Sequence, residues 1–358
     1  MTSQARILTT VVALLILMAP YRARAGDLNP PPGPIAPTNR VQLNAQAITL
    51  PFTINQSGSY VLTSNLTGVI GQAGIIVAAD NVTIDLNGFT LQGVPGGSLD
   101  GIRPSGLRRN MTVVNGFVAG WDGHGITGYF NIGLGDNICD NMRIEGVTVS
   151  GNGNIGILGR TGSLVRGCIA EGNGAGGIFT QNAGGIVENC VARGNAGVGI
   201  SIVDGAVVTG CAALNNTGSG IATGNGEITV VNCTAAGNGG HGIHAGSVGR
   251  VTIRGCMLKF NTGDGINVLS DSFVVENNSI LNTAAGVHVG LSGNRIEANN
   301  VVSNTRGIDV DAGGNLIIRN SAKNNGTNYD IVGVNTVGPT VNAANIATSD
   351  NPHANYDF

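Results

Sequence analysis

Histidine and aspartate residues recur at nearly constant spacing in the second half of the chain. With one asparagine they form a row whose members lie 23, 21 and 21 residues apart: His244, Asn267, His288 and Asp309. An imidazole beside a carboxylate can act as a general base, and the same groups can hold a divalent cation. The residue types therefore predict proton transfer or ligand binding, provided that the fold brings the members of the row together.

A repeat of about 22 residues explains this spacing. Five cysteines lie 22, 21, 22 and 23 residues apart, at Cys168, Cys190, Cys211, Cys233 and Cys256. Each is followed five residues later by asparagine and ten residues later by an isoleucine that a glycine precedes. The expected continuations of the cysteine slot are Phe89, Phe117 and Val147 upstream, and Asn278, Asn300 and Ser321 downstream; the isoleucine slot is expected to end at Ile331.

A period near 22 fits either a leucine-rich repeat or one coil of a parallel β-helix. Leucine-rich repeats need several leucines per unit, whereas here short β-branched runs alternate with corners rich in glycine and asparagine. We therefore predict an all-β protein, a single-stranded right-handed parallel β-helix of about 11 coils, capped at both ends. Successive coils would stack at roughly 4.8 Å, the spacing between strands in a sheet.

The two ends of the chain depart from the repeat. Arg6, an apolar run and an Ala-x-Ala sequence ending at Ala25 predict a signal peptide, and an uncleaved membrane anchor is the alternative. The signal peptide implies a secreted, periplasmic or cell-surface protein with no transmembrane segment after cleavage. The expected divisions are a signal peptide at 1–25, a proline-rich leader and N-terminal cap at 26–57, the β-helix at 58–334, and a C-terminal cap at 335–358.

The charge balance argues against a nucleic-acid partner. Charged residues make up only 11% of the chain. Removal of Arg6, Arg22 and Arg24 with the signal peptide lowers the number of Lys and Arg residues from 18 to 15, against 21 Asp and Glu. Phosphate contacts need clustered Lys and Arg, so a thinly charged acidic protein is not expected to bind nucleic acid.

The cysteines are expected to be free thiols. Because they share a slot with Val and Phe, we predict that they act as small buried hydrophobic residues rather than as disulfides. None has the C-x-x-C spacing of a zinc site, and no cofactor motif occurs in the chain. A divalent cation is compatible with the His and Asp row, although no motif indicates one.

The register places the candidate catalytic groups on one face of the solenoid. If each repeat isoleucine points inward, the next residue points outward. That outward slot holds, in order, Thr127, Leu158, Phe179, Ser201, Ala222, His244, Asn267, His288 and Asp309. We predict catalytic roles for His244, Asp264, His288 and Asp309, and substrate binding by Asn267, Arg306 and Asp311. The alternative is an exposed face that is simply polar.

A second candidate site lies near the first coils and includes Asp100, Arg103, Asp122 and His124. Trp121 is the only tryptophan, and we predict that it binds substrate as an aromatic platform for a sugar. Residues 92–110 and 127–142 belong to longer coils and are expected to supply the walls of any cleft. An aromatic side chain that covers an end or a loop is the alternative for Trp121.

The chain resembles the right-handed parallel β-helix repeat proteins exported by bacteria, which share the pectate-lyase-like fold. The matching stretches are LNPP in the leader, GSYVLTSNLT at 58–67, NVTIDLNGF at 81–89, the N-x-G-x-G-I repeats and the final NPHANYDF. This architecture serves lyases, hydrolases, epimerases and non-catalytic surface proteins. The resemblance therefore implies the fold and leaves the activity open.

Sequence signatures of particular activities are missing. Gly-His-Gly at 123–125 and 240–242 is typical of polygalacturonases. Those enzymes also need an Asn-Thr-Asp stretch and an Asp-Asp pair, which supply the acid and base carboxylates, and neither occurs here. The Asp-Pro-His-Asp stretch of alginate epimerases is also absent. We therefore expect a glycan-binding or structural surface protein whose partner is a polysaccharide or cell-envelope component. The alternative is a hydrolase or lyase of pectate-lyase-like fold that acts on an acidic, plant or algal polysaccharide.

Overall fold

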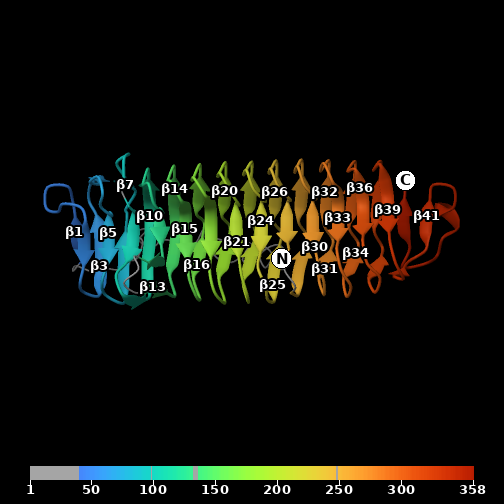
Figure 1. Cartoon of the computed structure of the whole chain (residues 1–358), viewed down its shortest axis with the longest axis horizontal. Helices are drawn as coiled ribbons and strands as arrows, with labels where there is room; N and C mark the ends of the chain where they lie inside the picture. Colours follow the sequence, from blue (N-terminus) through green and yellow to red (C-terminus); the bar gives the residue numbers. More distant parts are fainter. Residues whose placement is uncertain (1–39, 98, 132–135, 247–248) are drawn as a thin grey trace, which may run out of the picture. The chain divides into compact units, whose positions relative to one another are not determined.

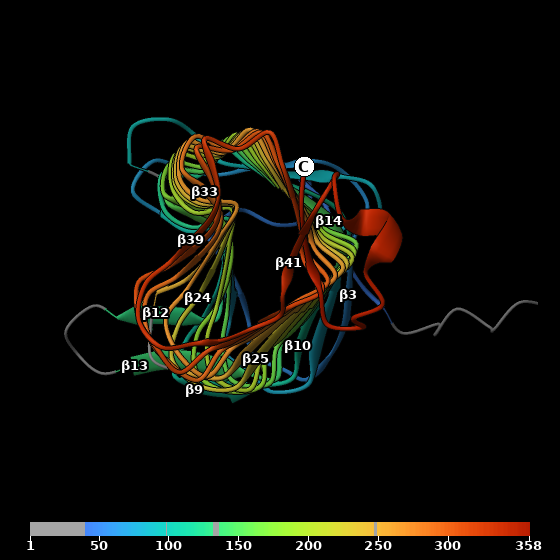
Figure 2. The same ribbon diagram turned by 90° about the vertical axis from the view of Figure 1, so that its right-hand side faces the viewer.

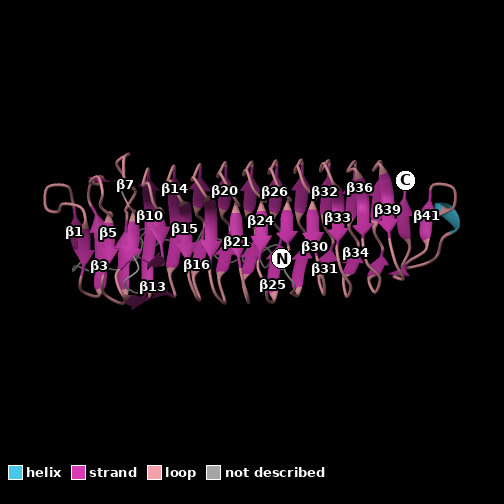
Figure 3. Ribbon diagram, viewed as in Figure 1, coloured by secondary structure: helices cyan, strands magenta, loops and turns pink. Residues whose placement is uncertain are grey.

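Residues 40–358 wind into a right-handed parallel β-helix (Figure 1). The computed structural model describes residues 40–97, 99–131, 136–246 and 249–358. The predicted signal peptide and residues 26–39 of the predicted leader lie outside the described residues. Among those described, the 3₁₀ turn η1 (Ile346–Thr348) is the only helical segment, as Figure 3 shows by colour. No described helix has the length and apolar character needed to cross a membrane.

Each regular coil contributes one strand to each of three rows, and Figure 2 shows the coils superimposed when viewed along the stack. The first row is a parallel sheet of 13 strands, against the 11 coils predicted. Its strands are β2 (Phe52–Ile54), β5 (Ile75–Val77), β8 (Ile102–Pro104), β11 (Ile126–Thr127), β15 (Ile155–Gly159), β18 (Gly176–Thr180), β21 (Ile200–Ile202), β24 (Ile221–Thr223), β27 (Ile243–Ala245), β30 (Ile266–Val268), β33 (Ala285–Val289), β36 (Arg306–Val310) and β39 (Thr327–Ile331).

The second and third rows join into one sheet through two long strands, β10 (Met111–Ala119) and β14 (Arg143–Ser150), which contribute to both. The other second-row strands are β1 (Val41–Leu43), β3 (Gly58–Leu62), β6 (Val82–Asp85), β16 (Leu164–Arg166), β19 (Ile186–Glu188), β22 (Val207–Thr209), β25 (Ile228–Val231), β28 (Val251–Arg254), β31 (Phe273–Val275), β34 (Arg295–Glu297), β37 (Leu316–Ile318) and β40 (Thr336–Val337).

The other third-row strands are β4 (Leu66–Thr67), β7 (Thr90–Gln92), β17 (Ile169–Glu171), β20 (Val191–Arg193), β23 (Ala212–Leu214), β26 (Thr234–Ala236), β29 (Met257–Lys259), β32 (Asn278–Ile280), β35 (Asn300–Val302), β38 (Ser321–Lys323), β41 (Thr340–Asn342) and β42 (Asn355–Asp357). A small separate sheet is formed by β9 (Leu107–Arg109), β12 (Tyr129–Asn131) and β13 (Asp136–Asp140).

A ladder of buried asparagines holds neighbouring coils in register. In each rung, one Oδ1 accepts hydrogen bonds from the backbone N–H and the Nδ2 of the asparagine one coil earlier, at 3.0 and 2.9 Å between Asn173 and Asn195. The ladder comprises Asn152, Asn173, Asn195, Asn216, Asn238, Asn261, Asn282, Asn304 and Asn325. Buried amides cost free energy unless they are hydrogen-bonded, so this ladder both satisfies them and fixes the stacking.

Glycine precedes the repeat isoleucine because the coils approach closely there. A Cβ on Gly177 would lie 2.5 Å from the carbonyl oxygen of Gly199 in the next coil. No side chain fits at that distance, so the sequence can offer only glycine at this slot.

All six cysteines are free and buried, as predicted. The backbone N–H of Cys168 donates to Cys190 Sγ at 3.4 Å, and Cys190 N–H donates to Cys211 Sγ at the same distance. The thiols of these repeat positions therefore form a ladder beside the asparagine ladder.

The predicted continuations of the cysteine slot are shifted by one residue at several points. Cys256 N–H donates to Asn277 Oδ1 at 2.9 Å, so the buried slot continues through Asn277, Asn299 and Asn320 rather than Asn278, Asn300 and Ser321. An amide oxygen thus replaces Sγ as the acceptor. Upstream, Gly116 rather than Phe117 pairs with Val147, and the Phe117 side chain is exposed.

The two first-row strands beyond the predicted 11, β2 and β5, both lie at the N-terminal end, where the repeat signature is lost. β1 and β2 fall within the predicted N-terminal cap yet already pair with β3 and β5. At the other end, β40 to β42 continue the second and third rows. Tyr329, not the predicted Ile331, pairs with Ile308, so the last strand of the first row is two residues out of the expected register.

Candidate functional site

The predicted polar row is present on the outer face of the first sheet. His244 pairs with Asn267, Asn267 with His288, and His288 with Asp309, on strands β27, β30, β33 and β36. The row extends one strand further than predicted, because Asp309 pairs with Asp330 on β39. Sequence reasoning missed Asp330 because Tyr329 replaces the repeat isoleucine that marks the slot.

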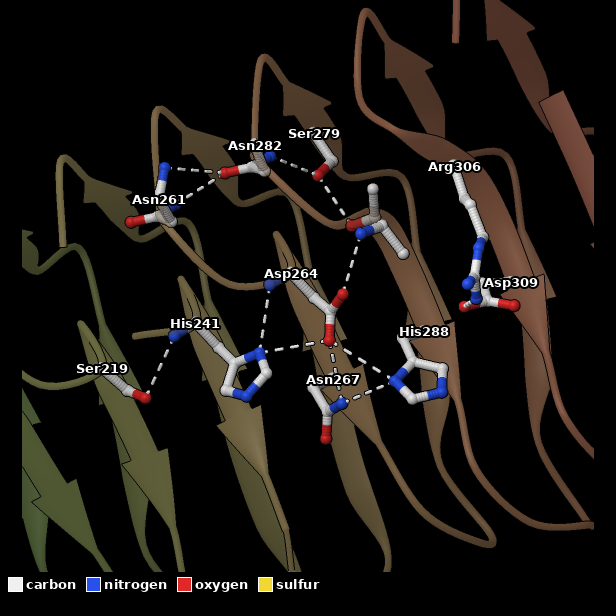
Figure 4. Close-up of polar contacts among 12 residues, drawn as sticks. Ser219, His241, Asn261, Asp264, Asn267, Ser279, Asn282, His288, Arg306 and Asp309 are labelled. Atoms are coloured by element: carbon white, nitrogen blue, oxygen red, sulfur yellow. Dashed lines mark hydrogen bonds and ion pairs between the residues drawn. The ribbon is translucent and has the colours of Figure 1, made fainter. Parts of the chain in front are cut away.

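Asp264 is the centre of the hydrogen-bond network beside this row (Figure 4). Only 9% of its side chain is exposed, and its Oδ1 accepts the backbone N–H of Ala285 at 2.8 Å. Its Oδ2 lies 3.0 Å from Asn267 Nδ2, 3.1 Å from His241 Nδ1 and 3.4 Å from His288 Nδ1. Burial acts to raise the pKa of Asp264, but hydrogen bonds from the two histidines and from the backbone outweigh it and hold that pKa well below its usual range.

His288 lies between two carboxylates. Its Nδ1 faces Asp264 and is 2.8 Å from Asn267 Nδ2, whereas its Nε2 lies 3.0 Å from Asp311 Oδ2. The hydrogen bond with Asp264 raises the pKa of His288 to about 9, with a further contribution from Asp311, although partial burial opposes it. This shift favours the imidazolium at neutral pH. In that state it donates hydrogen bonds and has no free lone pair with which to act as a base.

Asp309 forms an ion pair with Arg306, three residues earlier on the same strand. Only 7% of the Asp309 side chain is exposed, and its burial raises the pKa of the carboxyl group against the opposing influence of Arg306. Arg306 is half exposed, and its Nε lies 3.6 Å from Asp330 Oδ2. Arg306 thus stands between two carboxylates of the polar row.

His244 belongs to a different part of the network. Its ring stacks on that of His241, with centroids 4.8 Å apart and planes inclined by 14°. Burial lowers the pKa of His244, and the neighbouring His241 lowers it further, so the neutral ring is favoured. Its Nδ1 is buried and has no hydrogen-bond partner among the described residues.

A surface depression of about 410 Å³ lies beside the polar row. Its lining brings together five of the predicted site residues with a few neighbours: Asp264, Thr283, Ala284, Ala285, His288, Thr305, Arg306, Asp309 and Asp311. Thr283 and Thr305 were missed because they sit in the turns before β33 and β36, where the repeat carries no signature. None of the described residues of 92–110 and 127–142, the predicted walls, belongs to this lining.

Trp121 does not form the predicted platform. Its side chain is 1% exposed, and its Nε1–H donates to the carbonyl oxygen of Leu91 at 3.1 Å. A Cβ on Gly74 would lie 2.9 Å from the ring, which shows how closely the backbone packs on it. The predicted role in substrate binding is therefore corrected: the ring fills the interior of the first coils and presents no face to a sugar.

Asp100 and His124, two further members of the N-terminal candidate site, contact each other. Asp100 Oδ1 accepts the backbone N–H of His124 at 2.7 Å. Burial raises the pKa of Asp100 and lowers that of His124, which favours the uncharged form of each. They belong to the coils around β8 and β11, and neither lines the C-terminal depression.

Comparison with known proteins supports the fold. The family model described as "Right handed beta helix region" matches residues 52–235 and 219–352. No curated protein matches the chain significantly.

Among solved structures, two A-modules from Azotobacter vinelandii resemble the chain. The A-module of mannuronan C-5 epimerase AlgE4 is 17% identical, with a TM-score of 0.55 over 84% of this chain and 91% of that one. The A-module of AlgE6 is also 17% identical, with a TM-score of 0.53 over 84% and 90%. Pectate lyase Pel9A is 16% identical, with a TM-score of 0.44 over 78% and 69%. At these identities the likeness concerns the fold alone.

Proposed function

The chain belongs to the right handed beta helix region family, and on that premise we propose that it is a glycan-binding protein. The proposed binding face is the polar row, defined as His244, Asn267, His288, Asp309 and Asp330, with the adjacent depression. The observation that carries the proposal is the regular alignment of these five side chains on consecutive strands. They offer hydrogen-bond donors and acceptors at roughly 4.8 Å intervals, which suits a chain of hydroxyl-rich units lying along the axis.

The charges of this face favour an uncharged polysaccharide. Four carboxylates line the row and the depression, at Asp264, Asp309, Asp311 and Asp330, against the cationic groups of Arg306 and His288. The net negative charge would repel a polyuronate, whereas sugar hydroxyls can bond to carboxylates, imidazolium and guanidinium alike.

The comparisons support a glycan as the ligand class and go no further. The epimerase A-modules carry the name of a polysaccharide in their descriptions, but at 17% identity their activity does not transfer. The chain also lacks the Asp-Pro-His-Asp stretch expected of an epimerase. With the predicted signal peptide at 1–25, we place the function outside the cytoplasm, on a polysaccharide of the cell envelope or its surroundings.

Binding is tested by affinity electrophoresis of the full-length protein in gels that contain neutral or acidic polysaccharides. We expect retardation by at least one neutral polysaccharide, and affinity at least about 10-fold weaker for Asn267→Ala, which removes a central hydrogen-bonding group. Ser201→Ala is the matched control, because Ser201 occupies the same outward slot three strands earlier than Asn267. Absence of retardation across the panel, or equal losses in the two variants, would refute the proposal.

A second candidate function, glycoside hydrolysis, is favoured by one observation. Asp264 and Asp309 both line the depression, and the pKa of Asp309 is raised while that of Asp264 is lowered, as in enzymes where one carboxyl group is the acid and the other the base. Asp309 would be the proton donor. Release of new reducing ends from a polysaccharide, abolished in Asp309→Ala, would establish this function; full retention of release in that variant would exclude Asp309 as the acid.

A further inference from the structure

Three potential metal ligands converge at the mouth of the depression. One ligand atom each from His288, Asp309 and Asp311 lies within 4.8 Å of the other two. His288 Nε2 and Asp311 Oδ2 lie 3.0 Å apart. The Asp309 side chain is almost fully buried, while that of Asp311 is 55% exposed. The group is therefore enclosed by protein at Asp309 and accessible to solvent at Asp311.

A buried carboxylate on the opposite side of the imidazole orients it toward this group. Asp264 faces His288 Nδ1 and is itself fixed by the backbone N–H of Ala285 at 2.8 Å. This directs Nε2 of His288 toward the two other carboxylates. Histidines that bind metals characteristically donate their second ring N–H to a carboxylate in this way, which fixes the tautomer and the ring orientation. Asp264 is not one of the three proposed ligands, so the contact of its carboxylate with His288 Nδ1 is an observation independent of that group.

We propose that His288 Nε2, once its proton has been released to solvent, and the carboxylates of Asp309 and Asp311 bind a divalent transition-metal ion, with Zn²⁺ the best match. One imidazole nitrogen and two carboxylate oxygens suit Zn²⁺, whereas Ca²⁺ prefers six to eight oxygen ligands. Three protein ligands leave a coordination position that faces the depression. The sequence gives no metal motif because His288 comes from a different coil than Asp309 and Asp311.

Arg306 now pairs with Asp309 and would have to leave it when the metal binds. A second acceptor is already close, since Arg306 Nε lies 3.6 Å from Asp330 Oδ2. The Arg306 side chain is half exposed and therefore free to turn toward Asp330. Metal binding would thus break the ion pair of Arg306 with Asp309 and keep the one with Asp330, so the guanidinium charge retains a partner.

The site is tested by isothermal titration of ZnCl₂ into full-length protein freed of metal with EDTA and then dialysed. We expect one Zn²⁺ per chain and much weaker binding of Ca²⁺. Asp311→Asn and His288→Ala should each weaken Zn²⁺ binding at least about 10-fold, and Asp264→Asn, which removes the orienting carboxylate, about 10- to 100-fold. His244→Ala is the matched control: it changes a histidine of the same row that lies outside the ligand group, and affinity should be unchanged.

Absence of stoichiometric Zn²⁺ binding, or equal affinity of wild type and Asp311→Asn, would overturn the proposal. Asp311 is at the surface, so loss of fold is not expected in that variant, and circular dichroism checks this directly. The titration contains no polysaccharide and is therefore separate from the glycan test. Zinc binding by a protein that binds no glycan would uphold this site and refute the proposed function; the reverse result would refute the site alone.

Discussion

Asp264 and His288 are joined across neighbouring coils, with Oδ2 of the aspartate 3.4 Å from Nδ1 of the imidazole. The same oxygen lies 3.1 Å from Nδ1 of His241. One buried carboxylate therefore ties together side chains from coils on both sides of it. This makes Asp264 the structural centre of the proposed binding face, and its charge should be needed for both stability and ligand contact.

Replacement of Asp264 by asparagine should destabilise the protein. Asn keeps the shape but removes the charge and points an N–H₂ group toward neighbours that are themselves donors. We expect a loss of about 2 to 4 kcal/mol in the free energy of unfolding, the usual range for breaking a buried charged network. Urea denaturation measures it. Asp311→Asn, at an exposed position, should cost less than about 1 kcal/mol; equal losses would contradict this role of Asp264.

Stability of the metal-free protein should fall as the pH rises through about 9. The folded-state pKa of His288 is raised to about 9, above its usual value, so its contribution is fully present below the unfolded-state pKa and is lost as the folded state gives up its proton. The urea midpoint in EDTA should therefore decrease between pH 6.5 and 10. His288→Gln should flatten the decrease, and an identical profile in this variant would show that another group causes it.

The asparagine ladder should be sensitive to loss of a single rung. Asn238→Ala removes the Oδ1 that accepts from Asn216 and the Nδ2 that donates to Asn261 and to the Ala213 carbonyl. Because the remaining groups stay buried, we expect a loss of about 2 to 4 kcal/mol in unfolding free energy. Asn300→Ala is the control: its Nδ2 donates to Asn278 on a part-buried outer surface, and the cost should stay below about 1 kcal/mol. Similar losses would indicate that the ladder is not a main source of stability.

The thiols should be inert in the folded protein. All six cysteines are free and buried, so a reagent reaches a thiol only where the coil opens. Burial also raises the pKa of Cys139 to about 11, whereas hydrogen bonds from neighbouring thiols lower the pKa of Cys168 and Cys256, so these two are protected by burial alone. Ellman's reagent should detect almost no thiol in the native protein and all six after denaturation. Rapid reaction of any native thiol would mean that its coil opens readily.

The sequence predicts most of the fold because a solenoid repeats its constraints. The regular coils supply an inward isoleucine or valine, a glycine that permits close approach and an asparagine rung, so the period and the outward row from His244 to Asp309 follow from counting. The predicted register is wrong where a different residue type takes over the hydrogen-bonding role of a slot. Asn277 replaces a cysteine because its Oδ1 accepts the same backbone N–H, and nothing in the spacing alone separates it from Asn278.

The site is predicted less completely because its details depend on contacts between coils. The row and its neighbours Asp264, Arg306 and Asp311 were identified, but Asp330, Thr283 and Thr305 were not, since they lie outside the repeat signature. Trp121 was misjudged because a single tryptophan carries no period to show which way it points. Its burial results from glycines such as Gly74, which let the backbone close over the ring.

The most direct test of the glycan-binding face is the affinity for a length series of oligosaccharides from the polysaccharide that is bound. From His244 to Asp330 the row spans four strand intervals, about 19 Å at the usual spacing between strands. Affinity should increase until the oligosaccharide reaches that length and then level off, and Asp330→Asn should weaken only the longer members. Affinity that is already maximal for a single sugar, or that is unchanged in Asp330→Asn at every length, would contradict binding along the row.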